Sequence, residues 1–125
     1  HCIVERDIKA DNILVSHDCS DLRVIDFNTA RCTVGDDLLT MTGTKAYMPP
    51  EVLLGRSPSM GSDIWAAGVC LHFMVIGRLL DRLTCFGLDH ADFVPDMAKC
   101  RASWGHLSAP CRAVLGHCLE VVRVS

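Results

Sequence analysis

The chain has 125 residues, which is enough for one small domain. Half of its residues are hydrophobic and 22% are charged, a composition that argues against an intrinsically disordered chain. The formal net charge of -3 and the absence of Lys/Arg runs exclude a basic surface for nucleic acid or for an anionic membrane.

Eight cysteines are scattered along the chain, and no two of them form a C-x-x-C pair. Zinc sites usually show such close pairs, so we do not expect metal binding by cysteine. Free thiols in a reducing compartment are the expected state, with an extracellular disulfide framework as the alternative. We therefore expect a cytoplasmic protein, and a nuclear location is compatible with the same pattern.

Short apolar runs in the first part of the chain predict strands at Cys2–Val4, Ile13–Val15 and Leu22–Ile25. Residues 16–21, between the second and third runs, are mostly Ser and Asp, which favour turns. Strands this close together, joined by polar segments, indicate small antiparallel ribbons.

A polar loop at residues 5–12 separates the first two runs. It contains an Arg6-Asp7 pair, with Lys9 two residues after the aspartate and Asn12 five residues after it. The loop therefore combines an acid, a base and an amide at fixed spacings.

A second acidic position, Asp26-Phe27-Asn28, follows the third apolar run directly. Residues 26–51 then show little periodicity, and a loop of this length without secondary structure is usually functional or disordered. The segment closes on Gly43 to Glu51, and a short helix is predicted at residues 51–54, ended by Gly55.

The longest apolar stretch runs from Ile64 to Gly77 and is shorter than the roughly 20 residues that a membrane span needs. It predicts a helix over about 62–77, with Ser62-Asp63 as its N-cap and first turn. The helix is apolar nearly all round, which indicates burial on most sides. Two further helices are predicted, one within residues 91–100 and one over residues 108–122, where Pro110 lies near the start.

The loop with Arg6-Asp7, followed by Asp26-Phe27-Asn28, resembles the catalytic loop H-R-D-L-x-x-x-N and the metal loop D-F-G of eukaryotic protein kinases. Two later patterns, G-T-x-x-Y-M-x-P-E from Gly43 and D-x-W-x-x-G from Asp63, also match motifs of that family.

The resemblance implies an α+β, mainly α-helical fold: a protein-kinase-like C-terminal lobe with short β-ribbons at the catalytic loop. Residues 1–125 would be a partial kinase domain. Its implied parts are the catalytic loop at 5–12, the metal loop at 26–28, the activation segment at 26–51 and the central buried helix at about 62–77.

The family performs phosphoryl transfer, which depends on positioning and on cations that stabilise the developing charge. The resemblance implies that Asp7 accepts the proton of the substrate hydroxyl and that Lys9 neutralises charge on the transferred phosphoryl group. Asn12 and Asp26 would supply oxygens to Mg²⁺. The implied cofactors are therefore ATP and Mg²⁺, bound through Lys9, Asn12 and Asp26.

Lys9 together with Thr44 resembles the serine/threonine branch, so the implied partner is a protein substrate with a Ser or Thr hydroxyl. Arg6 suggests control by phosphorylation, since in such kinases this arginine pairs with a phosphate on the activation segment. Thr40 is the first candidate for that phosphate and Thr42 the second, which implies an upstream activating kinase. The alternative is that both threonines are solvated loop residues.

Three structural roles are also implied by the resemblance. Asp63 would hydrogen-bond the backbone of the catalytic loop, and Trp65 would pack beneath that loop. Glu51 would pair with an arginine near the end of the chain, for which Arg123 is the candidate. The segment around Arg123 is shorter than the family pattern L-x-x-D-P-x-x-R.

Two positions depart from the family pattern. Glu5 replaces the usual His, and a carboxylate at such an apolar place is unfavourable unless it is solvated or paired. Asn28 replaces the Gly of D-F-G, which is a mild change because Asn tolerates the left-handed backbone region.

The expected function is that of a serine/threonine protein kinase fragment, whose parent transfers the γ-phosphate of ATP to a protein hydroxyl. No Gly-rich loop and no V-A-I-K lysine occur, so we expect the N-terminal lobe to be absent and the isolated fragment to be inactive. The alternative is a pseudokinase or scaffold, favoured by Glu5 and opposed by the intact polar residues of both loops. A relic that never folds is a third reading. A lysine-bearing strand upstream would distinguish the first two.

Overall fold

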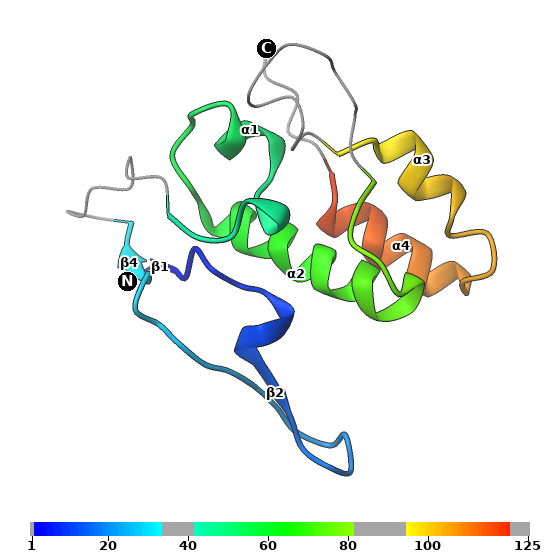
Figure 1. The fold of residues 1–125 in the computed structure, drawn as a ribbon, viewed down its shortest axis with the longest axis horizontal. Helices are drawn as coiled ribbons and strands as arrows, with labels where there is room; N and C mark the ends of the chain where they lie inside the picture. The colour runs from blue at the N-terminus through cyan, green and yellow to red at the C-terminus, as the bar shows by residue number, and fades with distance from the viewer. Residues whose placement is uncertain (1, 34–41, 82–94, 121–125) are drawn as a thin grey trace.

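The computed structural model describes residues 2–33, 42–81 and 95–120. It contains short strands followed by helices, as the sequence predicts (Figure 1). The elements are β1 (Ile3–Val4), a 3-10 helix (Ala10–Asn12), β2 (Ile13–Val15), β3 (Leu22–Val24), β4 (Arg31–Cys32), a 3-10 helix (Lys45–Tyr47), α1 (Pro50–Leu53), α2 (Met60–Ile76), α3 (Met97–Ala102) and α4 (Ala109–Cys118). The α+β class with mainly helical content is thus confirmed.

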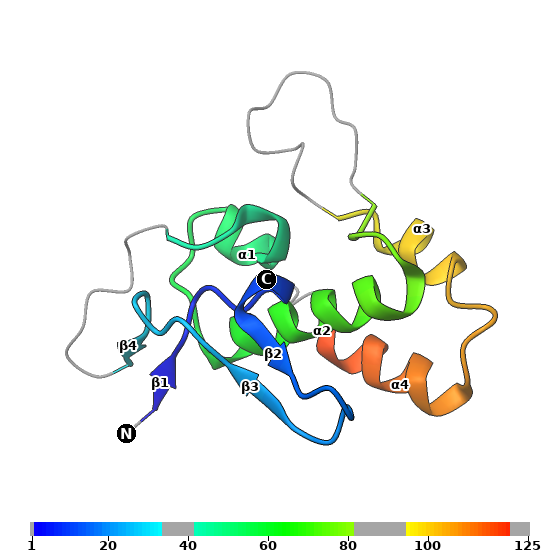
Figure 2. The same ribbon diagram turned by 60° about the horizontal axis from the view of Figure 1, so that its bottom comes forward.

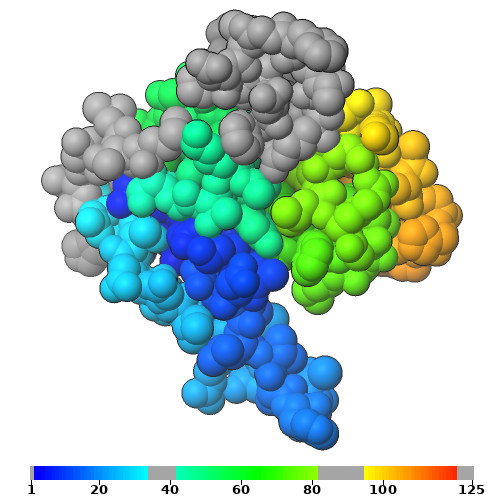
Figure 3. All heavy atoms as spheres, viewed as in Figure 1, coloured from blue at the N-terminus to red at the C-terminus, as the bar shows by residue number. Residues whose placement is uncertain are grey.

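The strands form two antiparallel ribbons, which confirms the predicted architecture of this part of the chain. In the first, β2 pairs with β3, so that Ile13 lies opposite Val24 and Val15 opposite Leu22. In the second, β1 pairs with β4, a strand that the sequence did not indicate. The β2–β3 ribbon projects from the body of the molecule, and Val15 and Leu22 on it are exposed (Figures 2 and 3).

Helix α2 is the predicted central helix, but it begins earlier than expected. Its N-cap is Ser59, and Ser62 lies inside the first turn, where its hydroxyl accepts a hydrogen bond from the Ser59 N–H at 2.9 Å. The prediction of Ser62 as N-cap is therefore wrong. Ser59 is the N-cap, and Ser62 is the third residue of the helix, where its side chain completes a capping box with Ser59. Gly77, with φ of 80°, ends the helix in the left-handed region that glycine favours.

The core lies between α2 and α4. Trp65 and Val69 of α2 are buried in it, together with Leu115 of α4 and Leu119 just beyond. A Cβ on Gly68 would lie 2.6 Å from the Cβ of Cys118, so the two helices meet at a position where only glycine fits. Helix α2 also contacts the 3-10 helix Lys45–Tyr47 and strand β1, so it lies at the centre of the packed part of the chain (Figure 1).

His72 is a fully buried polar residue on α2. Its Nδ1 lies 3.1 Å from the carbonyl oxygen of Arg78, and its ring packs edge-on against Trp104 with centroids 6.2 Å apart. Burial lowers the pKa of His72 below its ordinary value. The side chain is therefore a neutral core residue.

The remaining helices lie in the predicted parts of the chain, but their first and last residues differ from the predicted ones. Helix α1 begins at Pro50, one residue before the predicted start, and Gly55 with φ of 89° follows it. The helix expected within residues 91–100 is α3, which begins at Met97 and has Asp96 as its N-cap. Helix α4 ends at Cys118, before the predicted end at residue 122. None of the helices in the described residues is long and apolar enough to cross a membrane.

Candidate functional site

The polar loop before β2 is anchored to the first turn of α2 by one carboxylate. Asp63 accepts hydrogen bonds from the backbone N–H of Glu5 at 2.8 Å and from that of Arg6 at 3.0 Å. Arg6 has φ of 73°, an unfavourable value for a non-glycine residue. The hydrogen bonds expected from Asp63 are thus present, and they stabilise a strained turn. Trp65, one of the buried core residues, lies on the next turn of the same helix.

A second segment reaches this loop through Gly43. Its φ is 99°, and a Cβ built there would lie 2.2 Å from the carbonyl oxygen of Arg6. Only glycine permits two backbones to approach so closely with this geometry. The contact brings Thr44, the next residue, against the side chain of Asp7.

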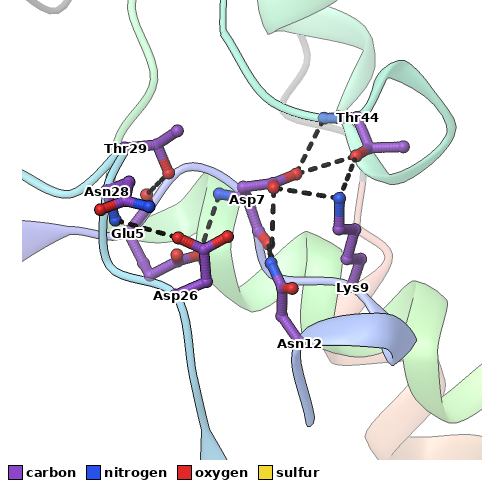
Figure 4. Close-up of polar contacts among 8 residues, drawn as sticks. All are labelled: Glu5, Asp7, Lys9, Asn12, Asp26, Asn28, Thr29 and Thr44. Atoms are coloured by element: carbon purple, nitrogen blue, oxygen red, sulfur yellow. Dashed lines mark hydrogen bonds and ion pairs between the residues drawn. The ribbon is translucent and has the colours of Figure 1, made fainter.

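The carboxylate of Asp7 is the centre of the site (Figure 4). Its Oδ1 accepts hydrogen bonds from the Thr44 N–H at 3.0 Å and from the Thr44 hydroxyl at 2.8 Å. Its Oδ2 lies 3.2 Å from Nζ of Lys9, which also donates to the Thr44 hydroxyl at 3.3 Å. Acid, base and hydroxyl therefore form one closed set of contacts, drawn from two segments of the chain.

Asn12 completes the set from the other side of the loop. Its Nδ2 donates to the carbonyl oxygen of Asp7 at 3.0 Å and to Asp7 Oδ2 at 3.4 Å. The backbone carbonyl of Asn12 accepts from the N–H of Ile25 at 2.9 Å, which ties the end of β3 to the loop. Since Nδ2 is used by Asp7, the side-chain oxygen of Asn12 is the atom left for a cation.

Asp26 is the residue after Ile25 and has a φ of 64°. Its exposed side chain accepts a long hydrogen bond, 3.4 Å, from the N–H of Asn28. Figure 4 shows Asp26 on the Glu5 side of Asp7, away from Lys9. The structure therefore joins Asp7, Lys9 and Thr44 tightly and leaves Asp26 beside them without a direct bond.

The charges of the site are uneven. The hydrogen bond and the charge of Asp7 raise the pKa of Lys9, so the ammonium form is stabilised. Burial raises the pKa of Glu5, and the carboxylates of Asp63, Asp7 and Asp26 add to that effect. The Glu5 side chain accepts a hydrogen bond from the Asp7 N–H at 2.9 Å, a contact that no sequence motif indicates.

The residues expected to respond to phosphorylation are described only in part. Arg6 donates from Nε to the carbonyl oxygen of Thr29 at 2.7 Å, while its Nη1 is buried without a hydrogen-bond partner in the described part of the chain. Thr42 and Arg6 line the same small cavity, of about 20 Å³. Thr40 lies outside the described residues.

The pair expected between Glu51 and Arg123 cannot be placed, because Arg123 also lies outside the described residues. Glu51 stands in α1, and its Oε2 is buried with no hydrogen-bond partner among residues 2–33, 42–81 and 95–120. Within these ranges no group of three or more His, Cys, Asp or Glu side chains has the geometry of a metal site.

Comparison with known proteins gives one family throughout. Residues 1–122 match the family model described as protein kinase domain. The serine/threonine-protein kinase kin-29 of Caenorhabditis elegans is 46% identical over 77 residues, which cover 60% of this chain and 9% of that protein. The cGMP-dependent protein kinase of Plasmodium berghei is 41% identical over 90 residues, 72% of this chain and 10% of that protein.

The chain thus spans about a tenth of the length of the curated relatives that it matches. Among solved structures, the kinase PK-1 of the Cydia pomonella granulovirus has a TM-score of 0.71 and 21% identity to this chain. The match covers 96% of this chain and 44% of that one, and it shows a common fold.

Proposed function

This chain belongs to the protein kinase family, and on that premise we propose that the protein containing it is a serine/threonine kinase. It would transfer the γ-phosphate of ATP to a Ser or Thr hydroxyl of a protein substrate. The described helices and ribbons would be the C-terminal lobe of the kinase domain. The match to 44% of the viral kinase chain supports this assignment.

One observation carries the proposal: the closed contact between Asp7, Lys9 and Thr44. A general base has to lie within hydrogen-bond reach of the proton that it accepts. Asp7 Oδ1 already accepts a hydrogen bond from one hydroxyl, that of Thr44, at 2.8 Å. The same oxygen is thereby suited to accept a hydrogen bond from the hydroxyl of a substrate.

The other residues would stabilise charge around that hydroxyl. Lys9 lies 3.2 Å from Asp7 Oδ2, and its ammonium would neutralise negative charge on the transferred phosphoryl group. The free side-chain oxygen of Asn12 and the exposed carboxylate of Asp26 are hard oxygen donors that fit Mg²⁺. Bound Mg²⁺ and ATP would supply the phosphoryl group and neutralise its oxygens.

Control by an upstream kinase is part of the proposal. The Nη1 atom of Arg6 is buried without a partner in the described residues, and a buried guanidinium nitrogen favours an anion. Thr42 lines the cavity beside it, and Thr40 lies two residues earlier. We propose that a phosphate on one of these threonines would pair with Arg6. A cytoplasmic location, with the nucleus as the alternative, is likewise proposed.

The test is phosphate transfer by the full-length protein that contains this chain, with labelled ATP, Mg²⁺ and a Ser/Thr peptide pool. Asp7→Asn should lower turnover by at least about a hundredfold, the contribution typical of a general base. The matched control is Asp21→Asn, because the Asp21 side chain is exposed and, among the described residues, pairs with exposed Arg23 on the projecting ribbon. A wild-type protein that transfers no phosphate, or an Asp7→Asn variant with full activity, would contradict the proposal.

A further inference from the structure

Glu5 is a buried acid two residues before Asp7, at the position where the family pattern has a histidine. The residue is only 6% exposed. Within the described part of the chain, its carboxylate accepts a hydrogen bond from the Asp7 N–H to Oε2, at 2.9 Å. Its other oxygen, Oε1, is buried and has no hydrogen-bond partner among the described residues.

The surroundings of Glu5 are unfavourable for a carboxylate. Asp63, Asp7 and Asp26 all lie close enough to repel its charge, and burial acts in the same direction. None of the ion pairs within the described ranges includes Glu5. A buried and unpaired acid lowers the stability of the folded state. Any favourable effect of Glu5 therefore has to come from a specific contact of its carboxylate.

The hydrogen bond from the Asp7 N–H to the Glu5 carboxylate is one of three consecutive backbone hydrogen bonds in this loop. The N–H groups of Glu5, Arg6 and Asp7 each donate to a carboxylate oxygen. Asp63 accepts the first two and Glu5 accepts the third. Arg6, in the middle, has the strained φ of 73°. The path of the chain into Asp7 is therefore fixed on both sides of the strained residue.

The backbone around Glu5 is also bonded to the segment that carries Thr29. The carbonyl oxygen of Glu5 accepts from the Thr29 hydroxyl at 2.8 Å, and the carbonyl oxygen of Thr29 accepts from Arg6 Nε at 2.7 Å. The backbone of Glu5 is thus fixed by hydrogen bonds with Asp63 and Thr29. Its side chain in turn accepts the hydrogen bond that fixes the Asp7 N–H. A dashed line in Figure 4 marks the hydrogen bond from the Asp7 N–H to the Glu5 carboxylate.

We propose that Glu5 is a positioning residue: its carboxylate holds the Asp7 amide, so that the Asp7 side chain faces Thr44 and Lys9. The acceptor oxygen is the required property, and the negative charge is not. The inference rests on the proposed kinase function, because the residue that Glu5 positions is the proposed base. It adds a carboxylate contact that the histidine of the family pattern would not provide.

The two properties can be separated by substitution. Glu5→Gln keeps an oxygen of the same reach and removes the charge among the neighbouring acids. Glu5→Ala removes both the oxygen and the charge. The matched controls are the same two substitutions at Glu120, an exposed glutamate beyond α4.

The assay is steady-state phosphate transfer by the full-length protein, with kcat and KM for the peptide measured separately. Glu5→Ala should lower kcat by about ten- to a hundredfold, the factor that corresponds to leaving the Asp7 amide donor unpaired, and leave KM nearly unchanged. Glu5→Gln should keep kcat within about threefold of the wild type and should unfold at no lower temperature. The Glu120 variants should match the wild type.

Full activity of Glu5→Ala, or a Glu5→Gln variant as impaired as Glu5→Ala, would overturn the proposal. Deuterium exchange of the Asp7 amide provides a readout that does not depend on activity. It should become about tenfold faster or more in Glu5→Ala and stay slow in Glu5→Gln. If the wild type transferred no phosphate, this exchange pattern would still support the positioning role, while the proposed function alone would fail. Equal exchange in both variants would refute the positioning role.

Discussion

Gly68 is the residue at which the contact between α2 and α4 can be tested most directly. A Cβ at this position would lie 2.6 Å from the Cβ of Cys118, and 3.0 and 3.1 Å from two side-chain carbons of Leu119. The Cβ of Cys118 is fixed to its backbone and cannot rotate away. Gly68→Ala therefore forces α4 to move outward, and the core between the helices has to loosen.

Two opposing effects set the size of the change. Carbon atoms in contact prefer about 3.5–4.0 Å, so a shift of about 1 Å is needed, and such overpacking costs about 1–3 kcal/mol. Alanine in place of glycine inside a helix returns about 0.8–1.0 kcal/mol. The net expectation is a loss of about 0–2 kcal/mol in the free energy of unfolding, with a middle value of about 1 kcal/mol.

Gly116 in α4 is the matched control. A Cβ there meets no atom within 4 Å, so Gly116→Ala should stabilise the protein by about 0.5–1 kcal/mol. Both variants are measured by urea unfolding of the full-length protein, with the midpoint and slope compared to the wild type. The reasoning predicts opposite signs for the two glycines. A Gly68→Ala variant stabilised as much as Gly116→Ala would refute the described packing of α2 on α4.

Three further predictions concern the site and the core. Asp63→Ala should lower the free energy of unfolding by about 3 kcal/mol, because two hydrogen bonds to backbone N–H groups are lost. Hydrogen–deuterium exchange of the Arg6 amide should become at least about tenfold faster, and an unchanged exchange rate would contradict this. Lys9→Met should lower kcat about a hundredfold without moving the unfolding midpoint, since its ion pair with Asp7 is partly exposed; equal kcat would count against its role. Burial holds the pKa of His72 below 6.5, so the unfolded state takes up the extra proton and stability should fall as pH drops below about 6.5. His72→Leu should lack this slope in urea midpoints measured from about pH 8 to about pH 5, and an unaltered slope would exclude His72 as its source.

The parts of the fold that the sequence predicts are those with a clear period or a known spacing. Strand β2 has the predicted bounds, Ile13–Val15, because a compact apolar run between turn residues leaves little choice. Helix α2 was recognisable from its apolar length. The motif that begins at Asp63 led to the expected bonds with the loop, because a carboxylate in a first turn is free to accept backbone donors.

Other parts carry no local signal. Strand β4 has only two residues, which is too short for any alternation, and its pairing with β1 depends on contacts across the chain. The start of α2 was misplaced because Ser59 and Ser62 are both capable caps, and the choice between them depends on the chain that enters the helix. The contact from Glu5 to the Asp7 amide requires the positive φ of Arg6, a conformation that the preferences of arginine do not indicate.

The carboxylate of Asp7 is saturated by its own chain. Oδ1 accepts the amide and the hydroxyl of Thr44, while Oδ2 faces Lys9 and Asn12. A carboxylate has about four lone-pair positions, so a hydroxyl group arriving from outside gains a bond only by displacing one of these donors. The Thr44 hydroxyl is the donor that can leave by rotation about a single bond. Under the proposed function, the hydroxyl of a protein substrate would therefore compete with the Thr44 hydroxyl for Asp7 Oδ1.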